Sequence, residues 1–318
     1  MNYDVFNGDA DGICALIQLR LAKPKQSTLI TGVKRDIKLL DKIDAIRGDK
    51  VIVLDISMKK NQQQLDIFLQ REVNVFYADH HLAGDIPDSP NLTAFIDTHT
   101  NICTSLIINK YLNNLYPLWA ITAAYGDNLF DSAKDLAIKN KLDSAVQNQL
   151  QKLGTYINYN GYGSCLEDLH FSPKELYLQM INYSSPLDFL SDNKAVYNKL
   201  EQGYLDDFEK VTTIKAEYSK QNTAVFILPD KGWAKRISGV FGNQLANQYP
   251  DKAHAVISLT SSNDYQVSVR APLNNKSKAD ELCSSFPSGG GRKAAAGINH
   301  LPKEKLELFI QKFEKTYA

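Results

Sequence analysis

Apolar residues in the first part of the chain fall into short runs separated by amphipathic stretches. The runs, which are candidate strands, lie at 3–6, 29–30, 51–54 and 73–77. Helical patterns lie between them at 13–21 and 62–69. Runs that stay apolar, instead of alternating with polar residues, are typical of strands buried on both faces. The pattern therefore predicts an α/β fold with helices on both faces of a parallel sheet.

The pattern changes further along the chain. From Thr104 to about Lys215 it is mostly helical, with no convincing strand. A second α/β pattern follows, with strands at 224–228, 253–259 and 265–270, a helix at 237–247, a glycine-rich loop and a terminal helix from Lys303. We therefore expect a parallel-sheet N-terminal domain at 1–190, a helical connector at 191–220 and a smaller α/β C-terminal domain at 221–318.

Charge and composition restrict the partners. The 318 residues include 36 Lys and Arg and 36 Asp and Glu, so the formal net charge is zero. Long nucleic acids are bound largely by neutralising phosphates, and a neutral chain is poorly suited to that. A short anionic ligand in a local pocket fits this composition.

Cysteine usage and the N-terminus indicate a cytoplasmic location. Cys14, Cys103, Cys165 and Cys283 are scattered without a Cys-x-x-Cys spacing, which favours free thiols in a reducing compartment. The first twelve residues contain acids and lack the basic and apolar regions of a secretion signal. No apolar run of eighteen residues is present to span a membrane, so we expect no membrane partner.

Residues that can bind metals follow three of the candidate strands. They are Asp9 and Asp11 after 3–6, Asp55 after 51–54, and Asp79, His80 and His81 after 73–77. A further carboxylate, Asp127, follows an apolar helical stretch. Because the carboxyl ends of parallel strands meet at one edge of the sheet, we expect these side chains to lie together.

Each of these residues alone has an ordinary explanation. Asp9 and Asp11 could belong to a turn, Asp55 could cap a helix, and Asp127 could be a loop residue. Together they would repel one another unless cations neutralised them. Carboxylates and imidazoles suit Mn²⁺ or a similar divalent ion, and the number of ligands is enough for two ions, as in phosphoester hydrolysis.

The same segments resemble the four motifs of the DHH phosphoesterase family. NGDADG, VLDIS, YADHH and AAYGDN occur in the family's order, and GGGRKAAAG, preceded by VSVR, resembles the DHH-associated C-terminal domain. The resemblance implies that the N-terminal domain is catalytic and that the C-terminal domain binds substrate. It also implies a cofactor of two Mn²⁺ ions, with Mg²⁺ or Co²⁺ as alternatives.

The resemblance also implies roles for individual residues. One ion would be held by Asp11, His80 and Asp127 and the other by Asp9, with Asp55 bridging both and contributing to catalysis. His81 would face the scissile phosphate, and a water activated by the two ions would attack it. Asp79 and Asn7 would orient the metal ligands without binding the ions themselves. The usual family histidine four residues before Asp9 is replaced by Val5.

For the C-terminal domain, the resemblance implies phosphate binding. The candidates are Arg270, Gly289, Gly290, Gly291 and Arg292, the last of which stands where the family usually has histidine. We expect the alanines after the glycines to start a helix whose N-terminus favours phosphate. His99, Thr104 and Ser105 are further candidates to line the active site.

The expected function is hydrolysis of short oligonucleotides or linear dinucleotides, of RNA or DNA, to mononucleotides. Three alternatives stay open: a single-strand exonuclease acting on longer nucleic acid, a cyclic dinucleotide phosphodiesterase, and a catalytically impaired nucleotide-binding protein. A homodimer is compatible with the sequence, which does not determine the oligomeric state.

Overall fold

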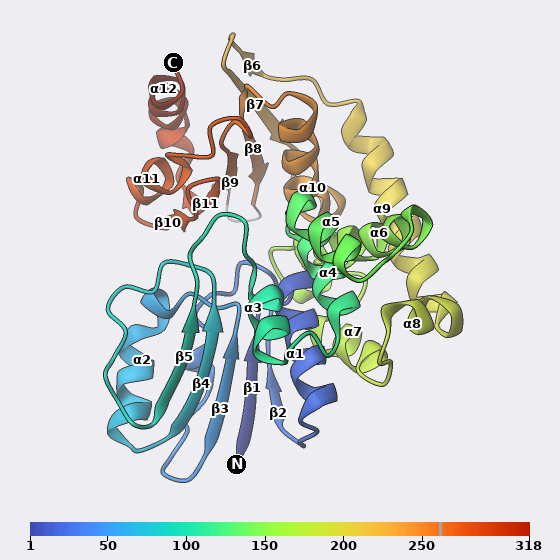
Figure 1. Cartoon of the computed structure of the whole chain (residues 1–318). Helices are drawn as coiled ribbons and strands as arrows, with labels where there is room; N and C mark the ends of the chain where they lie inside the picture. The colour runs from blue at the N-terminus through green and yellow to red at the C-terminus, as the bar shows by residue number, and fades with distance from the viewer. Residues whose placement is uncertain (261–262) are drawn as a thin grey trace. The chain divides into compact units, whose positions relative to one another are not determined.

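The computed structural model describes residues 1–260 and 263–318 (Figure 1). The chain divides into two compact units, 1–161 with 165–201, and 162–164 with 202–318. Both are α/β, which confirms the predicted fold class. The predicted domain limits at 190 and 220 stay an expectation; in the structure, helix α9 (Lys194–Thr212) contributes residues to both units.

The first unit is built on a parallel sheet of five strands in the order β2-β1-β3-β4-β5. Their bounds are β1 Asn2–Phe6, β2 Thr28–Ile30, β3 Lys50–Leu54, β4 Asn74–Asp79 and β5 Leu92–Ile96. The first four confirm the predicted strands. The sequence pattern did not predict β5, because this edge strand has no fully buried residue and lacks a strong apolar run.

Helices cover both faces of this sheet (Figure 1). Neighbouring strand residues point to opposite faces, so Val5 and Asp4 contact different layers. On the face of Val5, helix α2 (Met58–Gln70) packs its buried Leu65 and Phe68. On the face of Asp4 lies helix α1 (Ala10–Ala22), whose Arg20 Nε donates to Asp4 Oδ2 at 2.7 Å. The buried charges are thus paired.

The segment after β5 is helical, as predicted. Its helices are α3 Thr104–Tyr111, α4 Pro117–Gly126, α5 Phe130–Lys139, α6 Ser144–Gly161, α7 Pro173–Met180, α8 Pro186–Asp192 and α9. Helices α4 and α6 approach closely through Gly126 and Gly154, since a Cβ on Gly154 would lie 2.0 Å from the Thr122 carbonyl oxygen. Within residues 1–260 and 263–318, the helices lack the length and apolarity that a bilayer crossing requires.

The second unit contains a mixed sheet in the order β10-β11-β9-β8-β7-β6. The strands are β6 Tyr218–Ser219, β7 Thr223–Leu228, β8 Ala253–Leu259, β9 Tyr265–Arg270, β10 Gly289–Gly291 and β11 Ala295–Leu301. Among the described strands of this sheet, only β7 and β8 pair in parallel. The helices of this unit are α10 Gly232–Gln248, α11 Ala279–Ser284 and α12 Leu306–Thr316.

The prediction for the glycine-rich segment was wrong. Gly289–Gly291 forms a short strand, and of the alanines that follow, Ala295 and Ala296 belong to the antiparallel strand β11, not to a helix. Alanine has the highest intrinsic helix propensity, but such propensities are small, and pairing with β9 overrides this one. Two of the glycines are required: a Cβ on Gly289 would lie 1.7 Å from the Cys283 carbonyl oxygen, and Gly291 has φ +143°, which favours glycine.

Candidate metal centre

The carboxyl ends of β1, β3 and β4 place the predicted acidic residues at one edge of the sheet. Asp55 directly follows β3 with φ +59°, a left-handed conformation that Asp and Asn tolerate better than most residues. Its backbone N–H donates to the Ala78 carbonyl oxygen at 3.0 Å, which connects the ends of β3 and β4. The parallel pairing therefore brings together side chains far apart in sequence.

Asp9 and Asp11 belong to the beginning of α1. Asp9 is its N-cap, and Asp9 Oδ1 accepts from the N–H groups of Asp11 and Gly12 at 3.0 and 3.1 Å. Asp11 accepts from the N–H groups of Thr104 and Ser105, both at 2.7 Å. These two donors begin α3, whose N-terminus favours a negative charge. The carboxylate of Asp11 is thus fixed in orientation by a second helix.

His80 presents one nitrogen to the carboxylates. Its Nδ1 lies 2.8 Å from the Ile102 carbonyl oxygen, which can only accept, so Nδ1 carries the proton. Nε2 lies 3.2 Å from Asp55 Oδ1 and 3.8 Å from Asp11 Oδ2. An imidazole lone pair and a carboxylate oxygen at this separation require a proton or a metal cation between them.

His81 and Asp79 form a separate pair beside these groups. Nδ1 of His81 donates to Asp79 Oδ1 at 2.7 Å and lies 3.9 Å from Asp55 Oδ1. Burial raises the pKa of Asp79, but the His81 charge and hydrogen bond more than offset this, so the pKa is below its usual range. Asp79 therefore orients His81, which is partly exposed.

Among residues 1–260 and 263–318, two groups of three side chains have ligand atoms close enough to share an ion. They are Asp11, His80 and Asp127, and Asp55, His80 and His81; in each group the atoms lie within 4.8 Å of one another. Asp127 is the C-cap of α4, so it comes from the helical segment and not from a strand. Oxygen and imidazole donors of this kind fit a divalent cation such as Mn²⁺.

The electrostatics of the cluster also favour a cation. Burial and the neighbouring Asp55 raise the pKa of Asp11 to about 7. Burial and repulsion from Asp9 raise the pKa of Asp55 well above its usual range. Both shifts reflect burial first and repulsion between neighbouring carboxylates second. A divalent ion would supply positive charge and keep both groups ionised.

The remaining predicted residues of this unit lie at different distances from the cluster. Thr104 Oγ1 donates to Asp55 Oδ1 at 3.2 Å, and Ser105 Oγ donates to the Asp11 carbonyl oxygen at 2.8 Å. Asn7 is buried, and its Nδ2 donates to the Lys34 carbonyl oxygen at 3.2 Å. His99 is exposed after β5 and belongs to neither group that could share an ion among the described residues.

Residues that the sequence patterns did not single out also contact the cluster. The Lys34 ammonium bonds Asp9 Oδ2, lies 3.8 Å from Asp127 Oδ1 and donates to Asn158 Oδ1 at 3.0 Å. Lys34 follows β2, so the reasoning that selected acids and imidazoles after strands would also reach this lysine. Asn158 belongs to α6, and no local signal marks it.

In the second unit, Arg270 is held by its own surroundings. Its guanidinium donates to Asn243 Oδ1 at 2.6 Å, to the Gly239 carbonyl oxygen at 3.2 Å and to the Tyr162 hydroxyl at 3.3 Å. Arg292 is exposed at the turn between β10 and β11, where its N–H donates to the Ala295 carbonyl oxygen at 2.8 Å. Substrate binding by these residues and by the three glycines stays a prediction.

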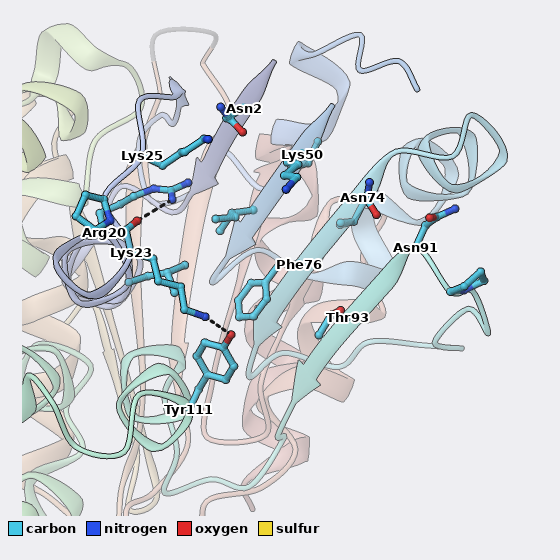
Figure 2. Close-up of a pocket in the computed structure, with 16 residues that line it drawn as sticks. Asn2, Arg20, Lys23, Lys25, Lys50, Asn74, Phe76, Asn91, Thr93 and Tyr111 are labelled. Atoms are coloured by element: carbon cyan, nitrogen blue, oxygen red, sulfur yellow. Dashed lines mark hydrogen bonds between the residues drawn. The ribbon is translucent and has the colours of Figure 1, made fainter. Parts of the chain in front are cut away.

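A surface pocket of the first unit lies away from the cluster. Its volume is about 550 Å³, and its lining includes Asn2, Lys50 and Asn74, the first residues of β1, β3 and β4 (Figure 2). It is therefore at the opposite end of the strands from the carboxylates. Arg20 and Lys23 also line it, and Figure 2 shows Lys23 bonded to the Tyr111 hydroxyl. None of the predicted site residues lines this pocket.

Comparison with known families agrees with this geometry. The N-terminal domain of the DHH family matches residues 3–137, and the DHHA1 domain matches residues 220–318. The chain belongs to the DHH family. It is an enzyme of the phosphoesterase class, with the carboxylate and imidazole cluster in its DHH domain.

Solved structures share the fold at low sequence identity. RecJ from Thermus thermophilus in complex with Mn²⁺ matches with TM-score 0.64 and 13% identity, over 100% of this chain and 52% of that chain. Another exonuclease RecJ bound to manganese gives 0.61 and 12%, over 100% and 90%. PggH from Vibrio cholerae, a pGpG-specific phosphodiesterase, gives 0.52 and 14%, over the full length of both chains. No curated protein sequence matches significantly.

Proposed function

We propose that this protein is a Mn²⁺-dependent phosphodiesterase that hydrolyses short oligonucleotides or linear dinucleotides to mononucleotides in the cytoplasm. The observation that carries the proposal is the 3.2 Å approach of His80 Nε2 to Asp55 Oδ1, two groups that a divalent ion can join. At least one ion would be held by Asp11, His80 and Asp127. When bound, the ion supplies polarisation of the phosphate and acidification of water.

The protein's own residues perform the remaining tasks in this proposal. Asp55, whose Oδ1 accepts a hydrogen bond from the Thr104 hydroxyl, would stay ionised beside a bound ion and help to hold it. His81, held by Asp79, is the partly exposed imidazole of the cluster and would neutralise charge on the phosphate. Proton transfer by a positioned side chain, most often a histidine, typically contributes about 10²–10⁴-fold to catalysis.

Short substrates are favoured over long strands by charge. The chain has equal numbers of acidic and basic residues, so it lacks the excess positive charge that tracks a long phosphate backbone. The full-length match to the pGpG-specific enzyme supports the same choice. The match to RecJ favours a second candidate function, exonuclease action on single strands.

The test is product analysis with three substrates. The purified protein would be incubated, with Mn²⁺ or with a chelator, with the linear dinucleotide pGpG, a cyclic dinucleotide and a single strand of about 20 nucleotides. Metal-dependent conversion of pGpG, with the other two largely intact, is the expected result. Degradation of the single strand at a similar rate would support the exonuclease. Binding of pGpG without conversion in Mn²⁺ would refute the enzyme proposal and support a nucleotide-binding protein.

A further inference from the structure

The ammonium group of Lys34 lies inside the metal-binding cluster. It bonds Asp9 Oδ2, donates to Asn158 Oδ1 at 3.0 Å and lies 3.8 Å from Asp127 Oδ1. The Lys34 side chain is 21% exposed, and that of Asp9 is 3% exposed. Removal of the ammonium would leave the buried carboxylate of Asp9 without its compensating charge, which is costly. Lys34 is therefore part of the cluster and not a solvated surface lysine.

The backbone around Lys34 is also fixed against the site. Its N–H donates to the Gly161 carbonyl oxygen at 2.8 Å, and its carbonyl oxygen accepts from Asn7 Nδ2 at 3.2 Å. The loop before it packs so closely that a Cβ on Gly8 would lie 1.9 Å from the Gly32 carbonyl oxygen. Because both sides of the peptide are held, the side chain is directed at Asp9 by the fold.

Asp9 is poorly placed to bind an ion as well. Its Oδ1 caps α1, and its Oδ2 carries the Lys34 ammonium. Val5, four residues before Asp9 in strand β1, is fully buried in the core and offers no ligand atom. Among the described residues, neither group that could share an ion includes Asp9. A divalent ion beside Asp9 would also meet the repulsion of a positive charge that already bonds it.

We propose that Lys34 takes the place of a second metal ion, so that the site holds one divalent cation at Asp11, His80 and Asp127 and one ammonium at Asp9. This inference rests on the proposed phosphodiesterase function, because it assigns Lys34 the second positive charge of the same site. It replaces the expectation of two bound ions. The site then requires only one metal-binding event to become complete.

The experiment counts bound Mn²⁺ by isothermal titration calorimetry and by metal analysis after equilibrium dialysis. We expect one ion per chain for the wild type and two for Lys34→Ala, in which Asp9 becomes available. Lys34→Arg keeps the positive charge and should bind one. Lys42→Ala removes an exposed lysine that pairs with Asp36, and it should also bind one. Circular dichroism spectra checked against the wild type establish that each variant is folded.

Two ions on the wild type, or one ion on a folded Lys34→Ala variant, would overturn the inference. Parallel assays of pGpG hydrolysis separate it from the proposed function. One ion on a wild type that does not hydrolyse pGpG or the single strand would leave the role of Lys34 in charge compensation intact and refute the phosphodiesterase. Two ions on a wild type that hydrolyses pGpG would support the phosphodiesterase and refute the role of Lys34. A wild type that binds no ion would refute both proposals.

Discussion

Replacing Gly154 by alanine tests whether the close approach of α4 and α6 positions Asp127. The added Cβ would lie 2.0 Å from the Thr122 carbonyl oxygen and 3.0 Å from the Gly126 nitrogen, both backbone atoms of α4. Neither can rotate away, so α4 must move. Asp127 directly follows α4, and it would therefore be displaced relative to Asp11 and His80.

The expected magnitude follows from two opposing terms. Overpacking of a buried helix contact costs about 1–3 kcal/mol, and contacts as short as these lie at the upper end. Alanine in place of glycine inside a helix gains about 1 kcal/mol. The net expectation is a loss of about 2 kcal/mol in unfolding free energy. Displacement of one ligand should weaken Mn²⁺ binding by about tenfold or more.

Gly242→Ala in α10 is the matched control. Gly242 is also a buried glycine in the middle of a helix, but the nearest atom to its added Cβ is Arg270 Cγ at 3.5 Å. This variant should gain up to about 1 kcal/mol. Urea unfolding measures both free energies, and calorimetry measures Mn²⁺ affinity. Equal stability and equal affinity of the Gly154 and Gly242 variants would refute the packing argument.

Three further predictions concern charge. Asp55→Asn should reduce kcat for pGpG by at least about 100-fold. It should not lower the melting temperature, because Asn tolerates the φ of +59° at this position. Turnover near that of the wild type would contradict the assigned site. Because the pKa of Asp11 is raised to about 7, protons compete with the metal for this carboxylate at low pH. The Mn²⁺ affinity measured by calorimetry should therefore be about tenfold weaker at pH 6 than at pH 8. Equal affinities at the two pH values would contradict this prediction. Burial lowers the pKa of His254 from 6.5 to about 4, so the unfolded state binds the proton first as pH falls. The unfolding free energy should therefore drop by about 2 kcal/mol from pH 7 to pH 5. If His254→Gln showed the same dependence of unfolding free energy on pH, this cause would be refuted.

Much of the first unit could be predicted because its signals are local. Strands buried on both faces read as apolar runs, and those of β1, β3 and β4 are strong. The rule that parallel strands end at one edge of the sheet was then enough to predict that the residues following these strands lie together. The edge strand β5 was missed because its partly exposed residues carry a weaker pattern.

Other features depend on contacts between distant segments. The alanines of β11 have no strand preference of their own, and pairing with β9 and β10 decides their conformation. The approach of Asp127 to Asp11 depends on helix packing through Gly126 and Gly154. A helical pattern shows which face is apolar but not which partner it meets.

The amino-acid sequence by itself determined the α/β class and the acids and imidazoles that gather at the strand ends, because periodicity and strand direction are properties of short segments. Tertiary structure alone decided that Lys34 bonds Asp9 and that Ile102 fixes the proton of His80. These contacts join residues 22 or more positions apart. Their geometry is set by how loops and helices pack around the sheet, and no local pattern of side chains records it.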